Sequence, residues 1–278
     1  MKPLVTLRHV ARIALLAVGL GALPRYTGAQ ATARDTTALH VLFVGNSYTY
    51  YNDLPSVVAD LSRASREAQR VAPEQVLFGG HTLEMHLARG DALAAIRRGG
   101  WNVVVLQEQS TRPIDAPSAT LRDVPRLAAE TRAVGARLAL YLTWAREARP
   151  LSQDTLTMTY TSAATATGAL IVPVGEAWRR ARADPAVGVA LREAQLSLFD
   201  ADGSHPSPAG TYLAAVVFFS TLFRTSPIGL PPTTRRTLDE PRPGPPAGAP
   251  RLALPVSLAR ELQRVAWEVV QPRLAAIP

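Results

Sequence analysis

Five short apolar runs, separated by segments with helical features, constrain the fold of this chain more than any other feature. They lie at residues 40–44, 75–78, 101–106, 137–143 and 169–172. Continuous apolar runs of this length, such as Val103-Val104-Val105-Leu106, are typical of strands buried on both faces of a parallel sheet. Strands that alternate with helices favour right-handed crossovers. The sequence therefore predicts an α/β fold with a mainly parallel five-stranded sheet.

The segments between and after these runs are predicted to be helical. Asn52-Asp53 is a candidate helix cap, and it is followed by Pro55, a residue that helices accept in their first turn. Pro73 and the pair Gly99-Gly100 are expected to end helices. The expected helices cover residues 54–70, 83–98, 120–134, 156–167, 176–182, 187–196, 209–223 and 256–275.

The N-terminus has the layout of a secretory signal peptide. Three basic residues within the first twelve positions precede an apolar run at 13–20, and an A-x-A-like cleavage site follows at 29–31. This pattern predicts a leader over residues 1–31 and a secreted or periplasmic protein. An uncleaved membrane anchor is the alternative, although the apolar run is short for a membrane span.

Beyond the leader, composition divides the chain into three further parts. No later stretch is apolar for long enough to cross a bilayer, so no stable membrane span is expected after leader removal. Proline and glycine are concentrated in one late segment, which predicts a loop or linker. The expected parts are one domain over residues 32–224, the loop over 225–255, and a helix over 256–278 that packs on the domain.

Charge and composition exclude several function classes. Removal of Lys2, Arg8, Arg12 and Arg25 with the leader leaves 26 of the 30 basic side chains against 22 acidic ones. The arginines are scattered, so a nucleic-acid groove is not expected. The chain has no cysteine, and its only lysine is Lys2, so thiol nucleophiles, thiolate metal sites and P-loop or Schiff-base lysines are excluded from the mature protein.

The first apolar run ends at Gly45-Asn46-Ser47, and this turn is the leading candidate for a reactive site. Gly45 is expected to supply a backbone conformation that other residues avoid. A turn at the carboxyl end of a buried strand holds its side chains where open α/β folds bind ligands. The segment therefore predicts an accessible hydroxyl at Ser47, with a plain turn as the alternative.

Asp202 and His205 can supply the groups that activate a serine. A serine hydroxyl becomes a strong nucleophile when a histidine takes its proton and a carboxylate orients that histidine. The two residues lie three positions apart, before Pro206, so their side chains can meet across one turn. Asp200 is a second candidate for the carboxylate. The alternative interpretation is that Asp202 and Ser204 only shape the turn.

Three strand ends can supply the donors that stabilise negative charge on a carbonyl oxygen. They offer the backbone N–H of Ser47, a backbone N–H at Gly79-Gly80, and a side-chain amide from Gln107 or Gln109. The carboxyl ends of parallel strands meet at one edge of a sheet, so these groups are expected to lie together. For each glutamine, a hydrogen bond that closes its own loop is the alternative.

In this order, the motifs resemble the sequence blocks of the SGNH/GDSL hydrolase superfamily, close to its uncharacterised secreted bacterial branch. Residues 44–47 resemble the first block, 78–82 the second, 105–110 the third and 202–205 the fifth. The resemblance implies a three-layer α/β/α, flavodoxin-like SGNH hydrolase fold. It also implies site roles: Ser47 as nucleophile, His205 as base, Asp202 as orienter, and an oxyanion hole formed by Ser47, Gly80 and Gln109.

Two departures from the family pattern stand out. The first block has Asn46 in place of the aspartate of Gly-Asp-Ser-Leu, and Tyr48 follows the serine. The third block lacks the usual Gly-x-Asn-Asp, and Gln109 falls where its asparagine would stand. A glutamine amide can still donate, but its side chain is one methylene longer.

Tyr48, His81, Gln107 and Trp144 are candidate substrate-binding residues, because each lies at or just after a predicted strand end. Trp144 could form an apolar or sugar-stacking wall, and core packing is the alternative for both Trp144 and Tyr48. A metal site is not expected. His81, Glu84 and His86 match neither the His-Glu-x-x-His pattern nor its inverse.

Together these observations predict a serine esterase that hydrolyses a carboxylic ester through an acyl-enzyme and needs no cofactor. The resemblance implies a small-molecule or carbohydrate ester as substrate, an acetylated carbohydrate included. The alternative is a non-catalytic, carbohydrate-binding relative of the same fold, motivated by the altered third block. An ordinary α/β-hydrolase would carry Gly-x-Ser-x-Gly, which is absent around Ser47. The sequence leaves the oligomeric state open.

Overall fold

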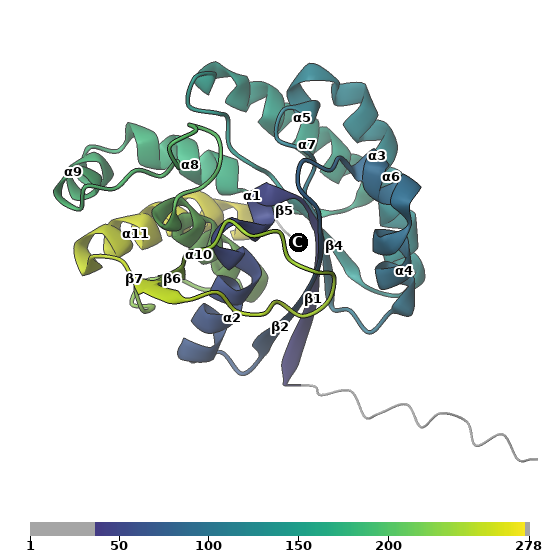
Figure 1. The fold of residues 1–278 in the computed structure, drawn as a ribbon, viewed down its shortest axis with the longest axis horizontal. Coiled ribbons are helices and arrows are strands. Elements are labelled where there is room, and N and C mark those ends of the chain that lie inside the picture. The colour runs from purple at the N-terminus through teal and green to yellow at the C-terminus, as the bar shows by residue number, and fades with distance from the viewer. Residues whose placement is uncertain (1–36, 276–278) are drawn as a thin grey trace, which may run out of the picture. The chain divides into compact units, whose positions relative to one another are not determined.

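The computed structural model describes residues 37–275, and the leader expected over residues 1–31 lies outside this range. Its main sheet contains β1 (Ala38–Gly45), β2 (Arg70–Leu77), β3 (Val103–Leu106), β4 (Arg137–Tyr141) and β5 (Leu170–Val172). The spatial order is β2-β1-β3-β4-β5, and every pairing is parallel (Figure 1). The predicted α/β class with a five-stranded parallel sheet is therefore confirmed.

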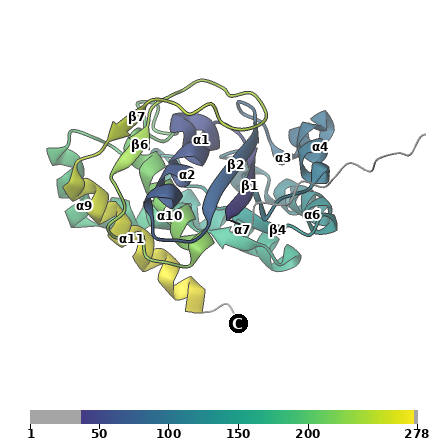
Figure 2. The ribbon, with the colours of Figure 1, turned by 90° about the horizontal axis from the view of Figure 1, so that it is seen from below.

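Helices cover both faces of this sheet and make the fold three-layered (Figures 1 and 2). Alternate residues of β1 point to opposite cores: Val41 and Phe43 to one, Leu42 and Val44 to the other. The first core is closed by α2 (Leu54–Ala64), α8 (Val174–Ala183), α9 (Pro185–Glu193), α10 (Pro208–Phe223) and α11 (Val256–Ala275). The second is closed by α3 (Leu83–Arg89), α4 (Asp91–Arg98), α6 (Pro117–Ala133) and α7 (Gln153–Thr167).

The remaining helical segments are short and lie at the ends of strands. They are α1 (Ser47–Tyr50), α5 (Arg112–Asp115) and the 3₁₀ turns η1 (Tyr51–Asp53) and η2 (Pro150–Ser152). These segments follow the carboxyl ends of β1, β3 and β4, and the polar residues at this edge of the sheet lie in them and in the loops that lead to them.

Helix α10 is apolar around its whole circumference because it lies between the sheet and α11. The hydroxyl of Ser207 accepts from the backbone N–H groups of Ala209 and Gly210, and Pro208 occupies the first turn. A Cβ on Gly210 would lie 2.2 Å from the carbonyl oxygen of Leu198, so only glycine permits this close approach. Among residues 37–275, no helix has both the length and the hydropathy needed to cross a bilayer.

Two expected helices end earlier than the sequence suggested. The helix expected over 54–70 stops at Ala64, and β2 already begins at Arg70, with Pro73 inside it. A strand accepts proline when it lies at the edge of a sheet, which is the position of β2. The helix expected over 83–98 is split at Gly90, whose φ of 90° is left-handed, so two short helices replace one.

The segment 225–255, expected to be a loop, contains an antiparallel pair, β6 (Thr233–Arg235) and β7 (Arg251–Ala253). Between these strands runs a strap, residues 237–250. Gly244 of the strap exchanges two backbone hydrogen bonds of 2.8 Å with Gln75 of β2. The strap thus covers the exposed edge of the sheet, which would otherwise present unpaired backbone groups.

Candidate active site

Ser47 is the first residue of α1, directly after β1, and its neighbour Asn46 caps that helix. The side-chain oxygen of Asn46 accepts from the backbone N–H of Tyr48 at 3.1 Å. Gly45 does not adopt the left-handed conformation that the sequence suggested. Glycine is required there for space, because a Cβ would lie 2.6 Å from Oε1 of Gln107.

His205 joins Ser47 to Asp202 through a chain of hydrogen bonds. Its Nε2 lies 2.8 Å from Ser47 Oγ, and its Nδ1 lies 2.5 Å from Asp202 Oδ2. The other carboxylate oxygen of Asp202 accepts from the backbone N–H groups of Ser204 and His205, both at 2.9 Å. Burial by itself would raise the pKa of Asp202, but these hydrogen bonds, led by that from His205, lower it. The residues predicted to act together do lie together.

Two contacts fasten the segment of His205 to the segment of Ser47. The hydroxyl groups of Tyr48 and Ser204 lie 2.8 Å apart, and the side-chain amide of Asn52 donates to the carbonyl of Pro206 at 2.8 Å. The ring of Tyr51 stacks on the imidazole with a centroid separation of 4.1 Å. The imidazole is therefore held on its face as well as at both nitrogens.

A pocket of about 190 Å³ opens beside Ser47 at the carboxyl edge of the sheet. It is lined by Asn46, Ser47, Tyr48, Gly80, Gln109, Ser110, Arg146, Ser204 and His205. Gly80 has a φ of 67°, a left-handed conformation that favours glycine. The backbone N–H groups of Ser47 and Gly80 have no acceptor within the described part of the chain. An oxygen with negative charge would find two unused donors here.

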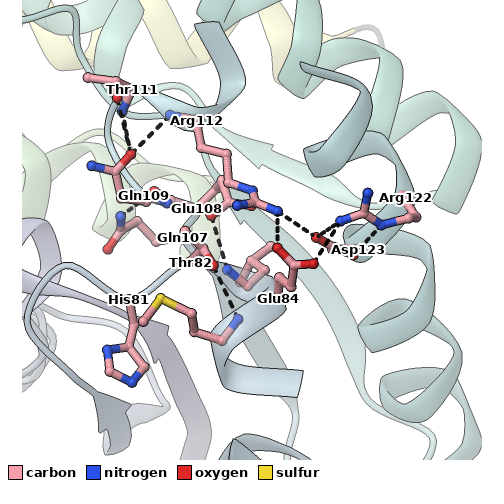
Figure 3. A network of polar contacts seen from close by, with 12 residues as sticks. His81, Thr82, Glu84, Gln107, Glu108, Gln109, Thr111, Arg112, Arg122 and Asp123 are labelled. Atoms are coloured by element: carbon pink, nitrogen blue, oxygen red, sulfur yellow. Dashed lines mark hydrogen bonds and ion pairs between the residues drawn. The ribbon is translucent and has the colours of Figure 1, made fainter. Parts of the chain in front are cut away.

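Gln109 also lines the pocket, and its amide orientation is fixed by the loop that follows it. Its Oε1 accepts from the backbone N–H groups of Thr111 at 2.9 Å and Arg112 at 3.0 Å. The NH₂ group makes only a long contact of 3.4 Å with Ser110 Oγ. The Oε1 atom of Gln109 is thus occupied by two backbone N–H groups, as Figure 3 shows. Its NH₂ group remains available to donate to a ligand.

A buried carboxylate, Glu108, supports Gln109 from below (Figure 3). Its Oε1 accepts from the backbone N–H of Gln109 at 2.7 Å and from that of Leu83 at 3.0 Å. Arg112 lies 3.7 Å from the other oxygen and also pairs with Glu84 at 2.5 Å. Burial raises the pKa of Glu108, although the two backbone donors and Arg112 oppose that change.

Three of the four candidate substrate-binding residues are buried among other side chains. Gln107 is 0% exposed, and its amide bonds Asn46 in both directions, at 2.9 and 3.0 Å. Trp144 is 1% exposed and stacks between Tyr48 and Trp178, with centroids 4.6 and 3.9 Å away. The predictions that Gln107 and Trp144 contact substrate are therefore wrong, because neither side chain reaches the pocket.

Tyr48 and His81 have supporting positions. Tyr48 is 2% exposed and forms the floor of the pocket, and burial raises the pKa of its hydroxyl. His81 does not line the pocket, but its carbonyl accepts from the side-chain amide of Asn46 at 2.9 Å. Both residues thus hold the turn that carries Ser47.

His86 is buried and fastens α3 to the end of β1. Its Nε2 lies 2.8 Å from the carbonyl oxygen of Gly45, so this nitrogen carries a proton and donates it to the hydrogen bond. Burial lowers the pKa of His86 to about 4. No group of three or more potential metal ligands comes together within residues 37–275.

Arg146, which lies on the loop between β4 and η2, is a charged pocket residue that sequence reasoning did not single out. Its Nη2 donates to Ser110 Oγ at 2.9 Å. The feature that led to Gln107 and Gln109, polar residues just beyond a buried strand, applies equally to Arg146 after the strand that ends at Tyr141.

The three-layer fold, with serine, histidine and aspartate hydrogen-bonded at the carboxyl edge of its parallel sheet, defines a class of α/β/α hydrolase. Comparison with solved structures identifies the family. A protein from Slackia heliotrinireducens classed with the SGNH hydrolases is 33% identical, with a TM-score of 0.53 over 66% of this chain and 99% of that one. The chain belongs to the SGNH hydrolase family.

Two more distant structures share the fold. A DUF4886 family protein from Bacteroides uniformis is 17% identical, with a TM-score of 0.63 over 84% of this chain and 95% of that one. A mutant of an acetylxylan esterase from Geobacillus stearothermophilus is 16% identical, with a TM-score of 0.50 over 66% of this chain and 92% of that one. No family model matches the chain, and neither does any curated protein.

Proposed function

We propose that this hydrolase cleaves a carboxylic ester through an acyl-enzyme formed on Ser47. The observation that carries the proposal is the chain of short hydrogen bonds from Ser47 Oγ through both nitrogens of His205 to Asp202. Such a chain lets a neutral imidazole accept the serine proton while the carboxylate fixes its tautomer and stabilises the imidazolium that forms.

In the acylation step, Ser47 Oγ attacks the carbonyl carbon while its proton passes to Nε2 of His205. The carbonyl oxygen becomes an oxyanion, which accepts from the backbone N–H groups of Ser47 and Gly80 and from the NH₂ group of Gln109. The intermediate then collapses, the bond to the alcohol oxygen breaks, and the alcohol leaves with the proton from His205.

In the deacylation step, His205 takes a proton from a water molecule, whose oxygen attacks the carbonyl carbon of the acyl-serine. The same donors stabilise the second oxyanion. When the bond to Ser47 Oγ breaks, the serine recovers its proton from His205, and a carboxylic acid leaves. The cycle as proposed uses side chains, two backbone N–H groups and water.

The size of the pocket supports a short acyl group. Its volume of about 190 Å³ is below the usual range for pockets that enclose drug-sized ligands. An acetyl ester fits this space, and an acetylated carbohydrate outside the cytoplasm agrees with the leader expected at the N-terminus. The alternative function, carbohydrate binding without catalysis, is less well supported, because Trp144 is buried and cannot stack on a sugar.

Hydrolysis of p-nitrophenyl acetate by residues 32–278 tests this function. Replacement of Ser47 by alanine removes the nucleophile, and we expect a fall in kcat on the order of 10³-fold or more. The circular dichroism spectrum and Tm of Ser47→Ala are the control for folding. Equal rates for both proteins would exclude the acyl-enzyme mechanism.

A further inference from the structure

Arg146 lines the pocket beside Ser47 without an acidic partner. The neighbouring Arg112 and Arg149 pair with carboxylates, at 2.5 and 3.3 Å. No ion pair of Arg146 with a carboxylate is found within residues 37–275, and the groups it interacts with are the neutral hydroxyls of Ser110 and Tyr48. The guanidinium therefore has unused capacity to bind an anion.

The surroundings of Arg146 increase this capacity. Its Nε is buried and has no hydrogen-bond partner among the described residues. An arginine side chain stays ionised, and a buried charged donor without an acceptor costs free energy. None of the nine residues that line the pocket is aspartate or glutamate. An anion in the pocket would therefore meet no competing carboxylate, and its charge would offset part of the uncompensated charge of the guanidinium.

Arg146 reaches the pocket from a different strand end than the oxyanion donors, although its Nη2 and the NH₂ group of Gln109 contact the same hydroxyl, that of Ser110, at 2.9 and 3.4 Å. Gly80, Ser47 and Gln109 follow β2, β1 and β3, which are adjacent strands, whereas Arg146 follows β4, the next strand beyond β3. Arg146 as a residue is half-buried, whereas Tyr48 on the floor of the pocket is buried. Because the proposed acyl group is acetyl-sized and carries no charge, an anionic group of the substrate that binds Arg146 belongs to the alcohol part of the ester.

We propose that the substrate is an ester whose alcohol part carries a carboxylate, such as an acetylated sugar acid, and that Arg146 binds this carboxylate. This inference rests on the proposed esterase function. The planar guanidinium presents paired N–H donors that match a carboxylate better than an ammonium group would. Arg146 then determines which ester is accepted without taking part in the bond-breaking steps.

Two substrates of the same shape test the inference: 4-acetoxybenzoate, which is an anion, and 4-acetoxybenzamide, which is neutral. We expect Arg146→Gln to lower kcat/KM for the anion by about tenfold to a hundredfold, the effect of losing a charged hydrogen bond. The neutral ester should change by less than about threefold. Arg146→Lys keeps the charge and should retain part of the preference for the anion.

Arg149→Gln is the matched control, because it removes an arginine from the same loop that does not line the pocket. It should leave the ratio of the two kcat/KM values unchanged. An equal loss for both esters in Arg146→Gln, or no preference of the wild type for the anion beyond the ratio of the uncatalysed rates, would overturn the carboxylate proposal while the esterase function stands.

Binding gives a readout that does not depend on turnover. Calorimetry on Ser47→Ala should show tighter binding of 4-acetoxybenzoate than of 4-acetoxybenzamide, and the preference should disappear when Arg146→Gln is added. If the wild type hydrolyses neither ester faster than Ser47→Ala does, the esterase function is wrong, but this preference would still support the anion site. Equal binding of both compounds would exclude the anion site at Arg146.

Discussion

The side-chain amide of Asn46 donates a hydrogen bond that the aspartate of the usual family block could not donate. Its oxygen accepts from the backbone N–H of Tyr48, while its NH₂ group donates to the carbonyl of His81 at 2.9 Å. A carboxylate would keep the first contact and lose the second, because it has no donor. The departure from Gly-Asp-Ser-Leu thus links the turn of Ser47 to the loop of Gly80 by a bond that needs an amide.

Replacement of Asp202 by asparagine should lower kcat by about 10²- to 10⁴-fold, because His205 loses the partner that fixes its tautomer. Esterase assays across a range of substrate concentrations would measure kcat and KM separately. Asp200→Asn is the control, since the carboxylate of Asp200 lies 3.5 Å from Arg236 and does not contact the imidazole. An equal effect of both substitutions would contradict the assignment.

The two glutamines of the third block should respond in opposite ways. Gln109→Ala removes a proposed oxyanion donor, and we expect kcat to fall about 10²- to 10³-fold with a smaller loss of Tm than Gln107→Ala, because the N–H groups of Thr111 and Arg112 that lose their acceptor belong to half-buried residues. Gln107→Ala leaves the buried N–H of Asn46 without its acceptor, and it should lower the free energy of unfolding by about 1–3 kcal/mol. Enzyme kinetics and thermal unfolding on both variants distinguish these roles. A Gln109→Ala enzyme with normal kcat would remove the third donor from the mechanism.

At the residue scale, sequence reasoning located the hydroxyl, the imidazole and the carboxylate, because each stands in a short motif with one expected neighbour. It misjudged Trp144 and Gln107, whose burial depends on Trp178 and Asn46 packing against them from other segments. A strand end shows only that a residue lies near the edge of the sheet. Whether its side chain turns inward or into the pocket is decided by tertiary contacts.

Among the elements, α3 depends on an uncharged histidine for its attachment to β1. The pKa of His86 is lowered to about 4 in the folded protein by burial, against about 6.5 in an unfolded chain. As the pH falls from about 6.5 to about 4, His86 binds a proton in the unfolded state but not in the folded state. The free energy of unfolding should therefore fall by up to about 3 kcal/mol over this window.

Denaturant unfolding of the wild type and of His86→Gln at pH values between 7 and 4 would measure this effect. Glutamine keeps an N–H donor for the carbonyl of Gly45 and cannot titrate. The variant should lose less stability than the wild type as the pH falls. Parallel curves for the two proteins would show that protonation of His86 is not responsible.

The elements that periodicity and caps define were predicted well, and those that need a distant partner were not. Helix α11 spans Val256–Ala275 as expected, because its apolar stripe and the flanking proline are local features. The hairpin of β6 and β7 has no such pattern. It lies against α2, where Arg235 and Arg251 bind a carboxylate at 2.6 and 2.7 Å.

For the molecule as a whole, that carboxylate, Asp60, joins the C-terminal third of the domain to its beginning. It is 8% exposed and binds Arg63, Arg235 and Arg251. Burial by itself would raise the pKa of Asp60, but the hydrogen bonds from the three arginines lower it. Its stabilising contribution is therefore present above about pH 4 and is lost as the pH falls below that value.

Asp60→Asn should lower the free energy of unfolding at neutral pH by about 3 kcal/mol, because Arg235 stays buried without a counter-charge. Asp154→Asn removes an exposed pair with Arg179 and should cost less than about 1 kcal/mol. Thermal unfolding of the two variants measures the difference. A loss of similar size in both would show that the hairpin does not depend on this ion pair.

The hydroxyl of Ser47 and the imidazole that faces it lie 158 positions apart in the chain. If Ser47 and His205 act as proposed, a ribosome must synthesise most of the domain before any chemistry can begin, and we expect a nascent polypeptide that ends before His205 to be inert. Contacts of such long range form late, because closing a large loop costs chain entropy. During refolding, the return of ester hydrolysis should thus lag behind the return of secondary structure. The lag would measure the time at which the segments of Ser47 and His205 come together.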